Sequence, residues 1–183
     1  MSDVKNVVTL GIGASPGDIH FFILVGLDTS PTAFGVDYFQ RAVIDKLKAD
    51  TTLTTELGGS NEIREDEWPG SDWSYPCLRI GIRDMTPSTD GKCHLTSWDV
   101  EFSVIAFTQP TVSGGIYNAS SDKCADLMDY VVDALYGEEL SITGRFHTET
   151  RVNVVNCLGP VPELPPGGWR GEVVFTAGVE EAR

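Results

Sequence analysis

The sequence holds few side chains whose type and spacing could do chemistry, and a glycine-rich stretch is the first candidate. Gly11–Gly17 has the composition of a loop that binds phosphate. A phosphate-binding loop needs Lys followed by Ser or Thr after its last glycine, and Asp18-Ile19 stands there instead. A dinucleotide-binding loop opens a helix, whereas the residues after Asp18 have the pattern of a strand. We therefore interpret Gly11–Gly17 as a turn and expect no cofactor.

Cys93-His94 could begin a metal site, because both side chains are ligands that zinc prefers. No further ligand lies at the required spacing, and the other histidines, His20 and His147, stand alone. The four cysteines include no Cys-x-x-Cys pair, so reduced and mostly buried thiols are expected. No Gly-x-Ser-x-Gly nucleophile motif occurs either. The sequence thus predicts no catalytic residue and no metal ligand among these side chains.

A short acidic run is the remaining candidate for chemistry. Its carboxylates could bind a cation or form a pair for acid–base catalysis, which would make the protein a small metal-dependent enzyme. Runs of this kind are more often solvated loops. We favour a protein that is not an enzyme and keep the metal-dependent enzyme as an alternative. The run consists of Glu62, Glu65, Asp66 and Glu67.

The charge balance restricts the partners. The chain has 13 Lys and Arg against 27 Asp and Glu, which gives a formal net charge of −14. Binding nucleic acid through its phosphates needs clustered cations, and the basic residues here are scattered. DNA could still slide past such a surface without being held. The longest apolar run, Ile19–Leu27, is far shorter than the roughly 20 residues of a membrane-spanning helix, so we expect no membrane partner.

Residues 1–35 differ in pattern from the rest of the chain. Val7–Ile12 and Ile19–Val25 resemble two short strands, with turn residues between them. An isolated hairpin is marginal in water, so these strands are expected to dock on the main domain or on a neighbouring subunit. Phe21 and Phe22 in the second strand are therefore candidate interface residues. We predict an N-terminal β-rich arm and linker over 1–35 and a separate domain over 36–183.

Apolar residues at helical spacing predict two main helices in the second domain. The first begins near Asp37 as N-cap, and its apolar stripe extends as far as Gly58-Gly59. The second starts at Ser120 or Ser121 and stops at Gly137. The two stripes are Val36, Phe39, Val43, Leu47, Leu53 and Leu57, and then Cys124, Leu127, Met128, Val131 and Leu135.

The strands of this domain are predicted from alternation and from flanking turn residues. In Trp98–Thr108 the even-numbered residues are apolar as far as Ala106, whereas Asp99, Glu101 and Ser103 are polar, which is typical of a sheet with one buried face. Ile105 and Phe107 interrupt the polar face, so that end is expected to be covered as well. We predict an α+β fold, a largely antiparallel sheet with the helices on one face. The other predicted strands are Cys77–Arg83, Arg151–Cys157 and Trp169–Val179, with Pro160, Pro162, Pro165 and Pro166 in a stiff loop between the last two.

Aromatic residues beside turn glycines and prolines are candidates for binding a partner protein. Trp68, Trp73 and Tyr75 flank Pro69-Gly70, and Trp169 follows Gly167-Gly168. Exposed Trp and Tyr are common anchors of protein interfaces. Alternatively, the same side chains cap the ends of the core sheet, and the sequence leaves both possibilities open.

The order of these segments resembles the small tail-terminator and tail-completion proteins of long-tailed bacteriophages. The resemblance covers about residues 36–183, from the end of the first helix to the last strand. The N-terminal 35 residues and a longer proline-rich loop at 159–168 depart from the pattern. The matching segments are Leu47–Leu53, Leu57-Gly58-Gly59, Ile63-Arg64, Tyr75–Gly81, Trp98–Phe107, Ala125–Leu135 and Trp169–Ala177.

This resemblance implies a structural virion protein at the neck of a siphovirus-like tail, made in the cytoplasm of the bacterial host. Such proteins form hexameric rings that stop polymerisation of the tail tube and present a surface to the head–tail connector. DNA would pass through the lumen of the ring without specific binding. Another neck protein, a stopper or an adaptor, is the alternative within the same class.

Overall fold

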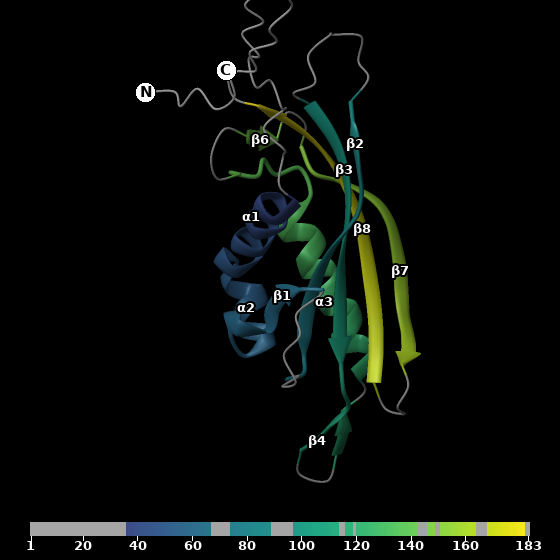
Figure 1. The fold of residues 1–183 in the computed structure, drawn as a ribbon. Helices are drawn as coiled ribbons and strands as arrows, with labels where there is room; N and C mark the ends of the chain where they lie inside the picture. The colour runs from purple at the N-terminus through teal and green to yellow at the C-terminus, as the bar shows by residue number, and fades with distance from the viewer. Residues whose placement is uncertain are drawn as a thin grey trace, which may run out of the picture. The chain divides into compact units, whose positions relative to one another are not determined.

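In the computed structural model, every residue whose structure is described belongs to one compact unit, Phe34–Arg183. Its helices lie on one face of a twisted sheet (Figure 1), so the predicted α+β class is confirmed. The N-terminal arm and linker predicted over 1–35 lie outside the described part of the chain. The described residues are 36–66, 74–88, 97–113, 116–118, 120–142, 146–148, 151–163 and 168–181.

The predicted first helix is in fact two helices, α1 (Val36–Ala49) and α2 (Thr51–Leu57). Asp50 separates them and caps α2, since its Oδ1 accepts a hydrogen bond of 2.8 Å from the backbone N–H of Leu53. The prediction of Asp37 as N-cap was wrong: it lies in the first turn of α1, where a carboxylate interacts favourably with the helix dipole. Gly58 ends α2 with a left-handed φ of 78°, as its position predicted, and a short 3₁₀ helix, η1 (Ser60–Glu62), follows.

The predicted second helix is α3 (Ser120–Leu135), which buries the expected stripe. It begins at Ser120, and Gly137 has a φ of 75° just after its end. The backbone N–H of Gly137 donates to the carbonyl of Val152, which ties the end of the helix to the chain leading into the seventh strand. None of the described helices is long and apolar enough to cross a membrane.

The main sheet has six described strands in the order β1-β2-β3-β8, with β6 and β7 both on the far edge of β8. All pairings are antiparallel except β1 with β2. The small hairpin β4–β5 leaves the end of β3 and precedes α3 (Figure 1). The strands are β1 (Ile63–Glu65), β2 (Cys77–Pro87), β3 (Ser97–Thr108), β4 (Thr111–Ser113), β5 (Ile116–Asn118), β6 (Phe146–Thr148), β7 (Asn153–Glu163) and β8 (Gly168–Glu181).

Two predictions about loops are corrected by this sheet. Ile63–Glu65 was expected in an acidic loop but forms β1, the parallel partner of Leu78–Ile80. Pro160 and Pro162 were expected in a stiff loop but lie within β7. An edge strand tolerates proline because the missing N–H points away from the sheet, and β7 is an edge strand.

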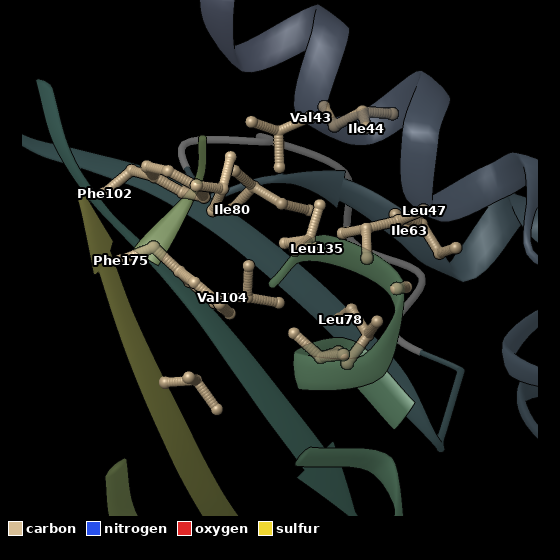
Figure 2. Close-up of a cluster of buried hydrophobic side chains, with 14 of the residues drawn as sticks. Val43, Ile44, Leu47, Ile63, Leu78, Ile80, Phe102, Val104, Leu135 and Phe175 are labelled. Atoms are coloured by element: carbon tan, nitrogen blue, oxygen red, sulfur yellow. The ribbon is translucent and has the colours of Figure 1, made fainter. Parts of the chain in front are cut away.

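The core lies between the helices and the inner face of the sheet. On β3 the residues Val100, Phe102, Val104 and Ala106 are buried, as the alternation predicted. Figure 2 shows side chains from α1, α3 and the strands meeting in one cluster. At its centre the ring of Phe102 meets Phe39 edge-on and stacks on Phe175, with centroid distances of 5.2 Å in both pairs. Such aromatic pairs add about 0.5–1.5 kcal/mol each beyond burial.

The far end of the outer face is covered as well, as expected from the interruption of its polar pattern. Ile105 and Phe107 form a second buried cluster with Cys77 of the neighbouring strand. Ser103, predicted on the solvated face, is also only 4% exposed. The outer face is therefore solvated over only part of its length.

Ion pairs, a hydrogen bond and the close packing of α3 on β8 hold the helices in place. Lys46 of α1 forms an ion pair of 2.7 Å with Glu138 after α3, and Lys123 of α3 pairs with Glu56 of α2. Thr108 at the end of β3 donates a hydrogen bond of 2.7 Å to the carbonyl of Ser120. Gly171 of β8 lies directly under α3, because a Cβ there would lie 2.2 Å from the sulfur of Met128.

Candidate interaction surfaces

Only two of the predicted interface residues are described, and both lie at the same end of the sheet. Tyr75 lies two residues before the start of β2 and is 37% exposed, with a cis peptide bond to Pro76. Trp169 is half-buried at the start of β8, opposite Thr108 and Pro162, and packs against the main core. Trp169 thus contacts the end of the core sheet while part of it stays exposed, and the interface role of Tyr75 and Trp169 stays a prediction. Trp68, Trp73, Phe21 and Phe22 lie outside the described residues, so their interface role stays a prediction.

The outer face of the sheet carries a compensated ion cluster. Glu172 of β8 is nearly buried and accepts from Arg83 of β2 at 2.5 Å and from Arg170 at 3.4 Å. Glu101 of β3 lies 4.0 Å from Arg83. Arg83 reaches Glu172 across β3, the strand that lies between β2 and β8. Each charge in this cluster has a neighbour of opposite sign, which stabilises the outer face.

A groove of about 830 Å³ runs between α1 and the β1–β2 edge of the sheet. On its floor, Gln40 donates a hydrogen bond of 2.6 Å to the carbonyl of Ile80. Its charged side chains are mixed in sign, with four acids and three bases. A surface of this kind suits a polypeptide better than a phosphate or a metal ion. These charged side chains are Asp37, Asp45, Glu65 and Asp66, and Arg41, Lys48 and Arg64.

The acidic run of the sequence does not converge on one point within the described chain. Glu62 is half-buried at the end of η1, whereas Glu65 and Asp66 are exposed beside β2. Glu67 is outside the described residues. Across the described ranges, no group of three His, Cys, Asp or Glu side chains lies close enough to hold a metal ion.

The opposite edge of the sheet exposes a row of apolar side chains that the sequence did not identify. Val155, Leu158 and Val161 of β7 are 55%, 47% and 53% exposed. The two register shifts of β7 against β8 fall at this row, between Val154 and Asn156 and between Leu158 and Val161. The stretch Val-Val-Asn-Cys-Leu has the composition of a core strand. The strand order makes β7 an edge strand, and the exposed fractions show that these side chains face solvent.

The fold is one that a virion protein also adopts. No family model matches the sequence, and no curated protein matches it. Among solved structures, a chain in the virion of a native gene transfer agent particle matches with a TM-score of 0.62. The match covers 79% of this chain and 96% of that chain at 19% identity, which shows a shared fold. The gp17 protein of bacteriophage SPP1 also matches, at 18% identity over 77% of this chain and 88% of its own, with a TM-score of 0.43.

Proposed function

We propose that this protein is a structural component of a phage-like virion and serves as a tail terminator. Copies of the chain, six as the family resemblance implies, form a ring that ends the tail tube and contacts the head–tail connector. The observation that carries the proposal is the fold shared with a virion chain, of which the match covers 96%. The segment order of residues 36–183 supports the same class.

The charge of the chain is consistent with this role. A ring through which DNA passes must not retain the DNA, and a net charge of −14 on each copy repels phosphate. No basic cluster and no metal-binding group is present among the described residues to hold nucleic acid or a substrate. We therefore propose an assembly protein without an enzymatic step, located in the neck of the particle and made in the host cytoplasm.

Residues 1–35 are assigned to assembly in this proposal. The sequence pattern of a complete core begins after Asp37, which leaves the arm for contacts between copies. The apolar strands expected in the arm would then be covered by a neighbouring subunit, as an extended segment adds to a sheet edge.

The test is to find the particle that the purified chain forms. Size-exclusion chromatography with light scattering and negative-stain images are recorded for the chain alone and with the tail tube protein of the same particle. We expect closed rings that attach to tube ends. A chain that stays monomeric at high concentration and in the presence of the tube protein would refute the proposal.

The same experiment distinguishes the neighbouring role in the neck. A ring that binds the head-side adaptor and leaves the tube unoccupied would identify a connector or stopper instead. Metal analysis of the purified protein addresses the enzyme alternative, because a stoichiometric metal ion would revive it. A ring bound to the head-side adaptor and a stoichiometric metal ion can each be told apart from a chain that does not assemble.

A further inference from the structure

Among the described residues, the β7 edge is the part of the surface least suited to face water. Edge strands of soluble proteins are commonly protected by charged side chains. In a chain with a net charge of −14, the stretch Asn153–Pro162 contains no charged residue. Three of its side chains, Val155, Leu158 and Val161, are among the few large hydrophobic residues that the described surface exposes. A neutral, apolar edge on an acidic protein indicates a surface that a partner covers.

The opposite edge of the same sheet offers a different unpartnered surface. Within the described ranges, no strand pairs with Gly81–Pro87 of β2 on the side away from β3. The groove beside this edge is flanked by the first turn of α1, where Val36 is 39% and Tyr38 is 49% exposed. Its charged side chains nearly balance, so this edge is also less acidic than the chain as a whole. Of the seven exposed large hydrophobic residues on the described surface, three thus lie on β7, and Val36 lines the groove at the other edge with Tyr38 in the same helical turn.

We propose that the β7 edge of one copy docks against the α1–β2 edge of the next copy. The inference rests on the proposed assembly of identical subunits, and it names the surfaces that make the contact. A closed ring needs two different patches on every chain, which meet head to tail. The two edges fit this requirement, because they lie on opposite sides of one sheet and each exposes apolar side chains. The exposed apolar side chains of β7 in one copy would cover Val36 and Tyr38 in the next copy.

The strand pattern of β7 limits how this contact forms. Pro160 and Pro162 have no N–H to donate, so the second half of the strand cannot extend a regular ladder. Asn153–Leu158 keeps its full set of backbone groups and includes the exposed Val155 and Leu158. The contact is therefore a short strand pairing supported by side chains, and the prolines prevent unlimited sheet extension between copies.

Cysteine cross-linking tests this geometry directly, with native Cys157 on β7 as one partner. A second cysteine is introduced on the β2 edge by M85C or P87C, because the β3 partners Val100 and Trp98 lie on the same face of the sheet as Val173, the partner of Cys157. Strands β2 and β7 are three interstrand spacings apart, about 14 Å, and a direct disulfide cannot bridge that distance within one chain. In the assembled ring we expect a disulfide between Cys157 of one copy and the introduced cysteine of the next, identified by mass spectrometry. Y136C is the matched control, because Tyr136 is 60% exposed and directly follows α3, outside both β2 and β7.

A second measurement uses L158K, with Y136K as the control. Lysine replaces an exposed large hydrophobic residue in both variants, so circular dichroism should show an unchanged fold. If Leu158 is an interface anchor, L158K raises the concentration needed for ring formation by roughly tenfold or more, and Y136K does not. Alkylation of Cys157 in the wild-type chain gives an independent readout, because its rate should fall markedly on assembly.

The outcomes separate this inference from the proposed function. Rings that form normally with L158K and leave Cys157 reactive overturn the inference and keep the tail-terminator proposal. Cross-links only between two Cys157 residues also overturn it, because they show β7 pairing with β7 in a symmetric dimer. A wild-type chain that never assembles, alone or on tubes, refutes both.

Discussion

Gly171 provides the sharpest test of how α3 is seated on the sheet. In G171A the new methyl carbon would lie 2.2 Å from the sulfur and 3.0 Å from Cγ of Met128, and 3.1 Å from the sulfur of Cys124. Contacts this short force Met128 into another rotamer or push the helix outward. Overpacking of this kind costs about 1–3 kcal/mol. An otherwise tolerated Gly-to-Ala change gains about 0.4–1 kcal/mol through the unfolded state, so we expect a net loss of about 1–2 kcal/mol.

The loss should be recovered when space is made for the methyl group. M128A alone removes most of a buried side chain and costs about 2–5 kcal/mol, largely through the cavity it leaves. In the double variant the methyl group introduced at position 171 partly fills that cavity. We therefore expect the double variant to be about 1–2 kcal/mol more stable than the sum of the single changes predicts.

The measurement is the free energy of unfolding in urea, followed by circular dichroism on the full chain. G159A is the matched control, because Gly159 also lies in a strand and a Cβ there meets nothing within 4 Å. It should stay within about 0.5 kcal/mol of wild type. A G171A variant as stable as G159A, or strict additivity with M128A, would show that α3 does not approach β8 as closely as the structure has it.

Three further predictions concern charge and the N-terminal segment. The hydrogen bond and charge of Lys46 hold the pKa of Glu138 in the folded protein below its usual value. The ionised carboxylate therefore stabilises the fold at any pH above the pKa that Glu has in the unfolded chain, about 4.3. This stabilisation is lost as the pH falls through the lower pKa of the folded protein. E138Q should therefore lower the urea midpoint at pH 7, and the difference from wild type should vanish in acid. Deleting residues 1–35 should preserve the circular dichroism spectrum and weaken assembly in light scattering. Raising NaCl from about 50 to 500 mM should promote assembly, because it screens repulsion between copies that each carry a charge of −14.

Each of these has an outcome that contradicts it. An E138Q difference that persists in acid would show that the pair with Lys46 is not its source. An insoluble or unfolded deletion variant would show that the arm belongs to the core. Assembly that weakens with salt would show that ion pairs, and not apolar contacts, hold the copies together.

Regular, local patterns account for the part of the fold that could be predicted. Alternation on β3 fixes which side chains face the core, and one stripe defines α3 together with its stop at Gly137. The break at Asp50 was missed because Leu53 and Leu57 continue the apolar stripe. Its signal was present, since Asp followed by two Thr residues is a typical helix start.

Pairings between distant segments account for what could not be predicted. β1 has three residues, too few for any period, and exists because it pairs with Leu78–Ile80. Pro160 and Pro162 are loop signals in sequence but are tolerated on an edge, and which strand is the edge depends on the order of the whole sheet. The exposed row on β7 was missed for the same reason. The contact of Trp169 with the core is of the same kind, because it depends on packing between distant segments and not on residue type.

The exposed row also explains why the N-terminal arm matters to the proposed assembly. Val155, Leu158 and Val161 are 55%, 47% and 53% exposed, so about half of each side chain remains to be buried. At about 1.5–3 kcal/mol for complete burial of each side chain, covering the rest of all three contributes about 2–5 kcal/mol. Association of two copies costs about 4–15 kcal/mol in lost freedom alone. The row by itself therefore cannot hold two copies together, and backbone pairing at β7 adds only a few hydrogen bonds. The apolar strands expected at Val7–Ile12 and Ile19–Val25 are the largest further source of apolar contact in the sequence, which is why we expect their removal to weaken assembly and to leave the fold intact.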